Sequence, residues 1–411
     1  MMTPDREMDP DDGFWTQRPE LAHVRAFARS RRAGTYATLA CVLRRITSCI
    51  EPNVVLPPTV GGIVSVNLFT ASAGRSGQGK GAADAAGFDS IRLIDHQAED
   101  LDAHRPNAGS GEGLARLFKG RGKDEPGITR AHLIVPEVGT LAALAGRQGG
   151  TLPSELLKAY MGEPLGFSNS SKETTTAVGA HAYRLCLGVG VQPENAGFFL
   201  EREKDGFPQR FLWVSTIDPY APEERPDPVD PMDIVVPDFG RDRYVVPIPD
   251  EARHAIDEHR RLVLIGSRDI DPLDGHLMLT RLKISFALAV LARRKGVDES
   301  DWKLAGELTD MSQRVRADIK LVLAERRRRE NAAKAHEQAE RDEIVADHAE
   351  ERVYSRARAA VVRRLEKGGV VSRKSIRTSM RSELKRHLDS VLADLISEGI
   401  VIERTGGYEM A

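Results

Sequence analysis

The sequence is poor in the groups that mark several classes of protein. Only three of its 411 residues are cysteines (Cys41, Cys49 and Cys186), and they lie in apolar stretches without metal-ligand spacing, which argues against a disulfide framework and a zinc site. No apolar run reaches the roughly eighteen residues that a membrane-spanning helix needs. The first twelve residues are acidic and polar, unlike a secretory signal peptide. These absences predict a cytoplasmic protein with reduced cysteines in its core.

Net charge is also close to zero, although it is unevenly distributed. The formal charge is −2 and 41% of the residues are hydrophobic, as in an ordinary globular protein, and the length is enough for two or three domains. Residues 355–411 nevertheless contain twelve Lys or Arg against seven Asp or Glu. Such a local excess of positive charge is expected where a domain meets a polyanion.

A glycine-rich segment at residues 74–81, with the sequence GRSGQGKG, is the most informative motif. It follows a run that reads as a buried strand at 63–69 and precedes an alanine-rich stretch at 82–86 that is expected to open a helix. A P-loop holds nucleotide phosphates in this context, with backbone N–H groups and the helix N-terminus pointing at them. The alternative is a plain glycine-rich surface loop. The residues expected to bind the nucleotide are Gly74, Ser76, Gly77, Gln78, Gly79, Lys80 and Gly81.

The motif departs from the usual pattern in the groups that organise Mg²⁺. Gly81 stands where a Ser or Thr hydroxyl normally helps to hold the ion. The apolar strand at 131–135 is followed by Pro136 and Glu137, where Asp-Glu is the common pair. We expect Glu137 to polarise the attacking water and to meet Mg²⁺, and the alternative is an acid at a helix N-terminus. Magnesium keeps several waters in proteins, so nucleotide binding is expected even if hydrolysis is slow or absent.

Three further polar residues follow in an order that suggests a nucleotide-hydrolysing site. Gln192 lies three residues beyond the apolar run at 184–189, where a side chain can sense the γ-phosphate, although it is equally suited to capping a turn. Arg210 precedes the strand-like run at 211–214, and a guanidinium there can reach a neighbouring subunit's nucleotide and stabilise charge on the transferred phosphoryl group. Arg281 opens a helical segment and is a candidate clamp from a lid, or simply a surface charge.

These motifs resemble the helicase-like domain of phage and plasmid primase–helicase proteins of actinobacteria. The resemblance covers roughly residues 14–325 and is carried by 65–69 before 77–80, by 109–114, by 191–193 and by 209–213. It implies an ATP-dependent motor that works on DNA as an oligomer, for example a hexameric ring, with a primase as a further partner.

The layout is also similar, more distantly, to the minichromosome-maintenance (MCM) branch of AAA+ helicases. In that branch an Arg-Phe pair before a strand acts as the arginine finger, which implies this role for Arg210. A lid helix that begins as Arg281-Leu282-Lys283 and continues into the pattern at 297–305 is also shared. This resemblance implies ATP and Mg²⁺ as cofactors and a C-terminal winged helix.

The last part of the chain has the pattern of such a winged helix. A helix stops at Gly368-Gly369, Ser372 is a helix N-cap, a third helix begins at Ser382 and ends at Gly399, and a hairpin turns at Gly406-Gly407. No aromatic cluster there favours stacking on single-stranded bases. The alternative is a protein-interaction module with a solvated basic face. The residues expected to bind DNA are Arg373, Lys374, Arg377, Arg381, Lys385 and Arg386.

The sequence therefore predicts an α/β protein with an AAA+-like P-loop NTPase sheet, a helical lid and a C-terminal winged helix. The expected parts are a disordered tail (1–13), an ATPase core with N-terminal helices (14–250), the lid (251–325), a charged helical linker (326–354) and a DNA-binding domain (355–411). The predicted function is an ATP-hydrolysing, helicase-like motor in the replication of a mobile element. The alternative is a nucleotide-binding, weakly hydrolysing replication or regulatory factor.

Overall fold

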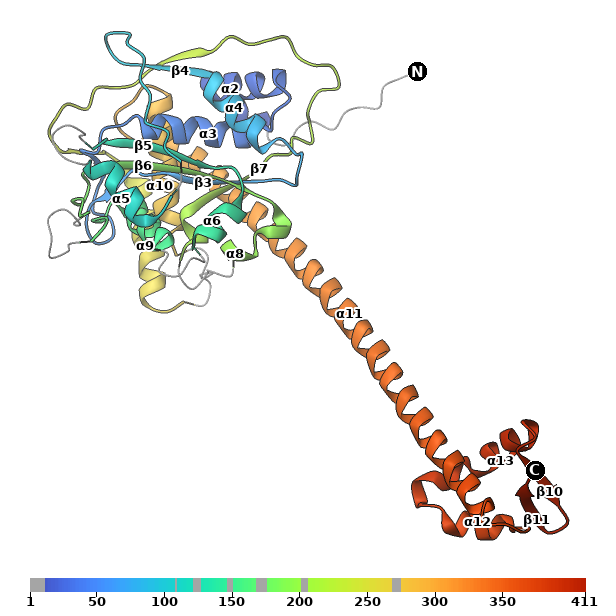
Figure 1. The fold of residues 1–411 in the computed structure, drawn as a ribbon. Helices are drawn as coiled ribbons and strands as arrows, with labels where there is room; N and C mark the ends of the chain where they lie inside the picture. The colour runs from blue at the N-terminus through green and yellow to red at the C-terminus, as the bar shows by residue number, and fades with distance from the viewer. Residues whose placement is uncertain are drawn as a thin grey trace. The chain divides into compact units, whose positions relative to one another are not determined.

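The fold is taken from a computed structural model (Figure 1). The structure describes residues 12–107, 109–120, 127–145, 151–167, 176–200, 206–267 and 275–411. All but the last two residues of the predicted tail, 1–13, lie outside the described residues, and those two belong to helix α1. The chain divides into two compact units, Met1–Ala324 and Glu325–Ala411.

The first unit mixes helices and strands along its whole length. Its elements are α1 (Asp12–Trp15), α2 (Pro19–Ser30), α3 (Thr35–Ser48), β1 (Val54–Leu56), β2 (Val64–Ser65), β3 (Phe69–Ala73), α4 (Lys80–Asp89), β4 (Ile91–Ile94), α5 (Gly111–Lys119), β5 (Arg130–Val135), α6 (Val138–Ala145), α7 (Leu152–Met161), β6 (Arg184–Val191), η1 (Pro193–Asn195), α8 (Gly197–Leu200), η3 (Pro208–Arg210), β7 (Phe211–Ser215), β8 (Met232–Val235), β9 (Tyr244–Val245), α9 (Asp250–Leu264), α10 (Leu277–Leu291) and the start of α11 (Glu299–Leu365).

A four-stranded parallel sheet lies at the centre of this unit. Its strand order is β5-β6-β3-β7, and every residue of β3 and β6 is buried. Helix α3 contacts all four strands, and Figure 1 shows α2, α3 and α4 on one side of the sheet with α5, α6 and α8 on the other. Strands covered on both faces read as continuous apolar runs, which is why the sequence indicated β5, β6 and β7 correctly.

The strand that leads into the glycine-rich loop lies later in the chain than predicted. The run at 63–69 was expected to be one strand, but its first part forms β2, which pairs with β1 in a separate three-stranded sheet. The strand before the loop is β3, which begins at Phe69. Two successive buried strands without a turn signal between them look like one apolar run, so the prediction was wrong in position.

The proline-rich stretch at 216–250 also contributes to the sheets. It carries β8, which pairs in parallel with β4, and β9, which pairs in parallel with β1. The following helices pack into the same unit: α10 is buried from Leu282 to Leu291 within the main hydrophobic cluster. Helix α10, which belongs to the segment predicted as a lid, is therefore built into the core of the first unit.

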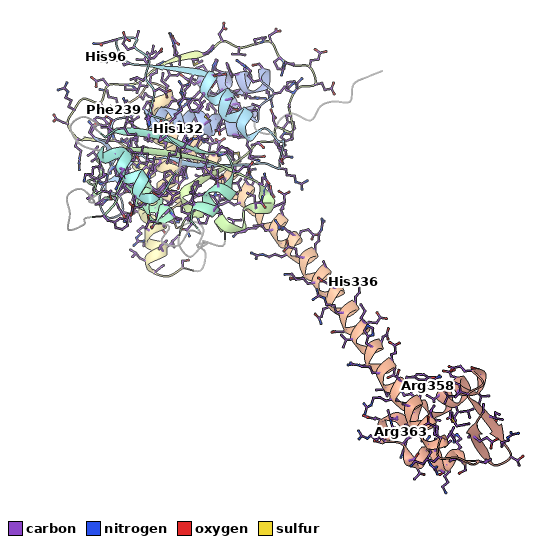
Figure 2. The ribbon with its side chains drawn as sticks, viewed as in Figure 1. His96, His132, Phe239, His336, Arg358 and Arg363 are labelled. Atoms are coloured by element: carbon purple, nitrogen blue, oxygen red, sulfur yellow. The ribbon has the colours of Figure 1, made fainter. Side chains whose placement is uncertain are left out.

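A buried arginine ties the P-loop helix to the sheet. Arg44 of α3 donates to Asp84 of α4 (2.7 Å), to the Thr70 hydroxyl of β3, and to Nε2 of His132 in β5 (2.8 Å); Figure 2 labels His132 in this region. Burial lowers the pKa of His132, which keeps the ring neutral and able to accept. A methyl group at Gly188 of β6 would overlap the Arg44 guanidinium, so the network depends on that glycine.

The three cysteines behave as predicted. Cys41, Cys49 and Cys186 are buried and free, and burial raises the pKa of the Cys186 thiol to about 11. They are therefore unreactive thiols in the core.

The second unit has its own small core. It contains the C-terminal part of α11, α12 (Arg373–Ser379), η5 (Ser382–His387), α13 (Leu388–Ser397), β10 (Val401–Arg404) and β11 (Gly407–Met410). The Ser372 side chain caps α12, and the two strands form an antiparallel hairpin, as predicted. The apolar stripe of the third helix is buried, except for Ile396, which is 37% exposed.

The charged stretch at 326–354 is helical, as predicted. It lies within α11, and nearly all its side chains are exposed. Pairs one turn apart, such as Arg326 with Glu330 (2.7 Å) and Glu325 with Arg329 (2.8 Å), support it. A helix that is polar on all sides depends on such i,i+4 pairs, because it has no buried face.

We predict that Gly188→Ala lowers the free energy of unfolding by about 2 kcal/mol. The added methyl group would displace the Arg44 guanidinium from the buried Thr70 and His132 and from the half-buried Asp84. Gly139→Ala is the matched control, because nothing lies within 4 Å of a methyl group at Gly139. Urea unfolding of both variants measures the difference, and equal stabilities would contradict the role given to Gly188.

Candidate functional site

The glycine-rich loop lies between the end of β3 and the start of α4. Gly77 and Gly79 have φ angles of 79° and 77°, a conformation that side chains other than glycine rarely adopt. Residues 75–78 are exposed, while the Gln78 side chain accepts from the backbone N–H of Arg75 (2.6 Å). The loop is thus a compact turn that opens to solvent at a helix N-terminus, as the P-loop prediction requires.

Thr216 lies against the first residue of this loop. Its hydroxyl donates to the carbonyl of Ala73 (3.2 Å), and a methyl group at Gly74 would overlap that hydroxyl. Gly74 is therefore needed for close packing between the loop and the end of β7.

Lys80 is the first residue of α4, and its side chain folds back across the loop. Its Nζ donates to the carbonyls of Gly74 (2.9 Å) and Arg75 (3.2 Å). It also lies 3.5 Å from Oε1 of Glu137. The Lys80 side chain is only 10% exposed and that of Glu137 is 46% exposed, so the pair closes one side of the loop while the carboxylate still meets solvent.

The approach of Glu137 to Lys80 depends on a glycine in the strand between them. Glu137 follows β5, Lys80 follows β3, and β6 lies between these two strands. A methyl group at Gly190 of β6 would overlap the carbonyl oxygen of Pro136 and come within 3.3 Å of Cδ of Lys80. The carboxyl ends of these parallel strands share one edge of the sheet, and Gly190 lets their side chains meet there.

Gln192 lies at the same edge. Val191 pairs with Ala73, so the next residues, Gln192 and Gly74, are neighbours at the ends of their strands. The Gln192 side chain accepts from Nδ2 of Asn195 (3.0 Å), which corresponds to the turn-capping alternative. Its position beside the loop also fits the predicted phosphate sensor.

Arg210 lies at the opposite end of the sheet from the loop. It precedes β7, whose first residue pairs with the first residue of β3, whereas the loop follows the last residue of β3. Its guanidinium donates to the carbonyl of Gly206 and lies 5.9 Å from the Tyr160 ring centre. Burial lowers the pKa of Arg210. Within one chain, the structure therefore does not bring Arg210 to Lys80.

Arg281 is likewise remote from the loop. Its guanidinium donates to the carbonyl of Trp302 (2.9 and 3.0 Å) and lies 3.9 Å from the centre of that indole ring. The preceding residue, Thr280, accepts or donates a hydrogen bond with Tyr160, near Arg210. Arg281 thus packs α10 against α11 instead of reaching the phosphate loop of its own chain.

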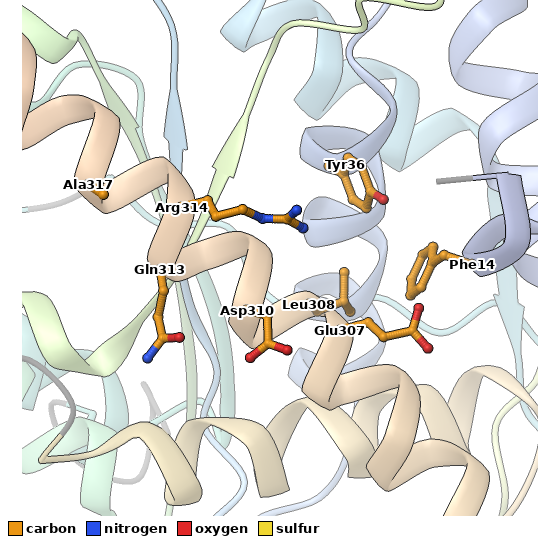
Figure 3. A pocket seen from close by; sticks show the side chains of 8 residues that line it. All are labelled: Phe14, Tyr36, Glu307, Leu308, Asp310, Gln313, Arg314 and Ala317. Carbon is orange, nitrogen blue, oxygen red and sulfur yellow. The ribbon is translucent and has the colours of Figure 1, made fainter. Parts of the chain in front are cut away.

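Two hollows lie on the β7 side of the loop. One, of about 420 Å³, is lined partly by Trp15, Ser215, Ile217 and Tyr220. The other, of about 630 Å³, shares Tyr36 and Arg314 with it; Figure 3 shows Arg314 of α11 extending towards Tyr36 of α3, with Glu307 beside Phe14. The residues on either side of Thr216, Ser215 and Ile217, line the smaller hollow, whereas no residue of the loop lines it. Its size is in the range of small-ligand sites.

Comparisons with known proteins find little likeness. No protein-family model matches the sequence, and no curated protein matches it at a significant level. Among solved structures, the chain is similar to a full-length MCM homolog from Methanopyrus kandleri, with 13% identity and a TM-score of 0.37. The match covers 75% of this chain and 63% of that one. A TM-score this low assigns no fold, so the mixed α/β architecture stated above rests on this chain's own parallel sheet.

The predicted DNA-binding residues all lie at the surface of the second unit, but only some carry unpaired charge. Arg373 forms a two-bond ion pair with Asp389 (2.8 and 2.7 Å), and Arg386 pairs with Glu350. The others have no ion-pair partner within the described part of the chain. These are Lys374, Arg377 and Arg381, which are exposed, and Lys385, which is half-buried.

The described residues were compared with the requirements of a metal site and of a membrane-spanning helix. No group of three or more His, Cys, Asp or Glu is placed to hold a metal ion there. In the part of the chain that the structure describes, Glu137 is the one carboxylate that forms an ion pair with Lys80. None of the described helices has the length and apolarity to cross a membrane.

Sequence reasoning missed Gly190 and Thr216. Gly190 carried a weak signal, since Gly188 and Gly190 alternate in an otherwise apolar strand, and glycine inside a strand marks a close backbone approach. Thr216 carried no signal, because only the pairing of β7 with β3 places it beside Gly74.

We predict that Gly190→Ala weakens binding of inorganic tripolyphosphate at least about tenfold, a free-energy change of about 1.4 kcal/mol. The methyl group would push the turn at Pro136 and the Lys80 side chain apart. Gly62→Ala, outside the loop, serves as the control, since nothing lies within 4 Å of a methyl group at Gly62. Titration calorimetry measures both, and unchanged binding by Gly190→Ala would show that the site tolerates this shift.

Proposed function

We propose that the chain is a P-loop nucleotide-binding protein that hydrolyses ATP while bound to DNA, as a helicase-like motor in the replication of a mobile element. The observation that carries this proposal is the meeting of Lys80 and Glu137, 3.5 Å apart, at the mouth of the loop. A phosphate-binding cation beside a half-exposed carboxylate is the minimum that nucleotide hydrolysis needs.

The proposed roles follow from the positions of the groups. Backbone N–H groups of residues 74–79 and Lys80 would bind the phosphates, in place of the loop carbonyls that Lys80 now contacts. Glu137 would orient and deprotonate the attacking water, with Gln192 beside the terminal phosphate. The nucleoside would extend towards the hollow at Ile217.

A single carboxylate fits a magnesium ion held mainly by phosphate oxygens and waters, because Mg²⁺ is commonly bound through one or two carboxylates. Glu137 is the residue that would meet it, directly or through water. The bound ion would neutralise charge on the phosphates and so assist the departure of the leaving group.

The two remote arginines lead us to propose an oligomer. Arg210 and Arg281 lie towards the end of the sheet away from Lys80, so they would act only on the nucleotide of a neighbouring copy. A closed ring of identical subunits would place one such end against each loop. The desolvated guanidinium of Arg210 would interact strongly with phosphate there.

The second unit is proposed to be the DNA-binding winged helix. Its three helices, its hairpin and the bridge between Val371 and Tyr408 follow the expected order of such a module. The basic excess in residues 355–411 supports a nucleic-acid partner.

The test is release of phosphate from ATP with and without duplex DNA. We expect Lys80→Ala to weaken nucleotide binding and abolish DNA-stimulated turnover. Glu137→Gln should lower kcat about a hundredfold or more while ATP still binds, because the amide cannot accept the proton. Glu99→Gln, an exposed acid elsewhere in the unit, is the control. Turnover by Glu137→Gln equal to that of the wild type would remove the proposed catalytic role.

A second function is favoured by Gly81 and Pro136, which replace the usual magnesium-organising groups. In this case the chain binds ATP and DNA and uses the nucleotide only to control assembly, with almost no hydrolysis.

We predict that Gly81→Ser raises the rate of Mg²⁺-dependent ATP hydrolysis several-fold, since the hydroxyl adds a ligand in open space. A rate that stays at background in both forms would favour the binding factor over the motor.

A further inference from the structure

The outward face of α13 is acidic, although this is the helix that would be expected to enter the DNA groove. The helix contains no Lys, Arg or His, its exposed residues include Asp389 and Asp394, and the exposed Glu398 directly follows its last residue. In helix-turn-helix proteins the recognition helix lies in the major groove between phosphates. Three carboxylates on its surface would repel the backbone there.

These carboxylates instead form pairs with other side chains of the second unit. Asp389 pairs with Arg373 of α12, and Glu398 pairs with Arg358 of α11. Asp394 accepts from the Tyr354 hydroxyl of α11. Arg358 and Arg373, the cations that contact these carboxylates, are thus engaged within the chain, and α13 itself carries no positive charge to offer to a phosphate.

Free cations gather on another face of the same unit. They lie at the end of α11 and on α12, they are exposed, and no carboxylate within the described residues pairs with them. The residues of this basic face are Arg363, Lys367, Lys374 and Arg377. Glu366 is the one acid interspersed among them.

Helix geometry separates the two faces. Arg363 follows Arg358 by five residues, which is about 140° around an α-helix; Figure 2 labels both on α11. Arg358 therefore points to α13, whereas Arg363 points well away from it. Arg364 donates to the Ser375 hydroxyl of α12 (3.2 Å), which places the end of α11 beside Lys374. The four cations of the basic face are consequently continuous across two helices.

We propose that duplex DNA lies with its phosphate backbone along this basic face and not along α13. This inference rests on the proposed DNA-binding function and adds which surface makes the contact. Such a mode binds mainly through phosphates, so it should depend strongly on salt and weakly on base sequence.

The experiment measures binding of a fluorescent duplex to the full-length chain by anisotropy, from about 50 to 200 mM salt. We expect Lys374→Gln/Arg377→Gln to weaken binding about tenfold and to reduce the slope of log K against log salt by about 2. The matched variant Ser390→Glu/Ala393→Glu adds two charges to the exposed face of α13 and should stay within about twofold of the wild type. Thermal unfolding confirms that both variants remain folded.

Each other outcome overturns the inference in a distinguishable way. A larger loss from the α13 variant than from the α12 variant would place DNA on α13. Unchanged binding by both would place the contact outside this face, while DNA binding itself stands. A wild-type chain that binds no duplex would remove the proposed function as well. If it instead binds vesicles containing phosphatidylserine through Lys374 and Arg377, the face serves a membrane surface.

Discussion

One face of strand β6 lacks side chains at two alternate positions, and the first unit depends on this gap. The Cβ positions missing at Gly188 and Gly190 lie on the same face of the sheet, since successive side chains along a strand alternate between the two faces. The space over Gly188 is filled by the Arg44 guanidinium, and the space over Gly190 by the Pro136 carbonyl and the Lys80 stem. The same absence of Cβ atoms thus anchors α4 through Asp84 and brings Lys80 to Glu137 at the strand ends.

Buried cations hold the other end of the sheet. Arg184 donates to Asn67 and to the carbonyls of Ile50 and Val54, while Lys283 donates to the carbonyl of Asn67. Burial lowers the pKa of Lys283, and the ring centre of Tyr160 lies 3.3 Å from its ammonium. Buried charges are tolerated only when hydrogen-bonded, so Asn67, just before β3, is held by the hydrogen bonds that Arg184 and Lys283 donate to it. The solvent-exposed phosphate loop therefore follows one end of β3, whereas Asn67, before the other end of β3, is fixed by buried hydrogen bonds.

Charge has a different use in the second unit. Its core is apolar, and ion pairs such as Arg358 with Glu398 join helices at the surface, where each contributes little by itself. Their main effect is to decide which charges remain free. The net charge of residues 355–411 therefore shows that the unit is basic, whereas the ion pairs determine which of its faces carries free positive charge.

The sequence by itself determined β5, β6 and β7, the glycine-rich loop and the helix that follows it. These features depend on only a few neighbouring residues, so they can be recognised from local sequence. Examples are the continuous apolar run at 184–189, the turn formed at Gly77 and Gly79, and the helix N-cap at Ser372. It also indicated Lys80 and Glu137 as partners, because residues after parallel strands share one edge of a sheet.

Only the tertiary structure decided which strands are neighbours and therefore what lies near what. Three features depend on contacts between segments far apart in the chain. They are the split between β2 and β3, the packing of Thr216 against Gly74, and the hydrogen bonds from Arg281 to the carbonyl of Trp302. Arg210 followed the P-loop in the expected order, yet its position before β7 puts it at the far end of the sheet, because β3 and β7 are parallel. Strand direction and register are properties of the assembled sheet, and no local pattern contains them.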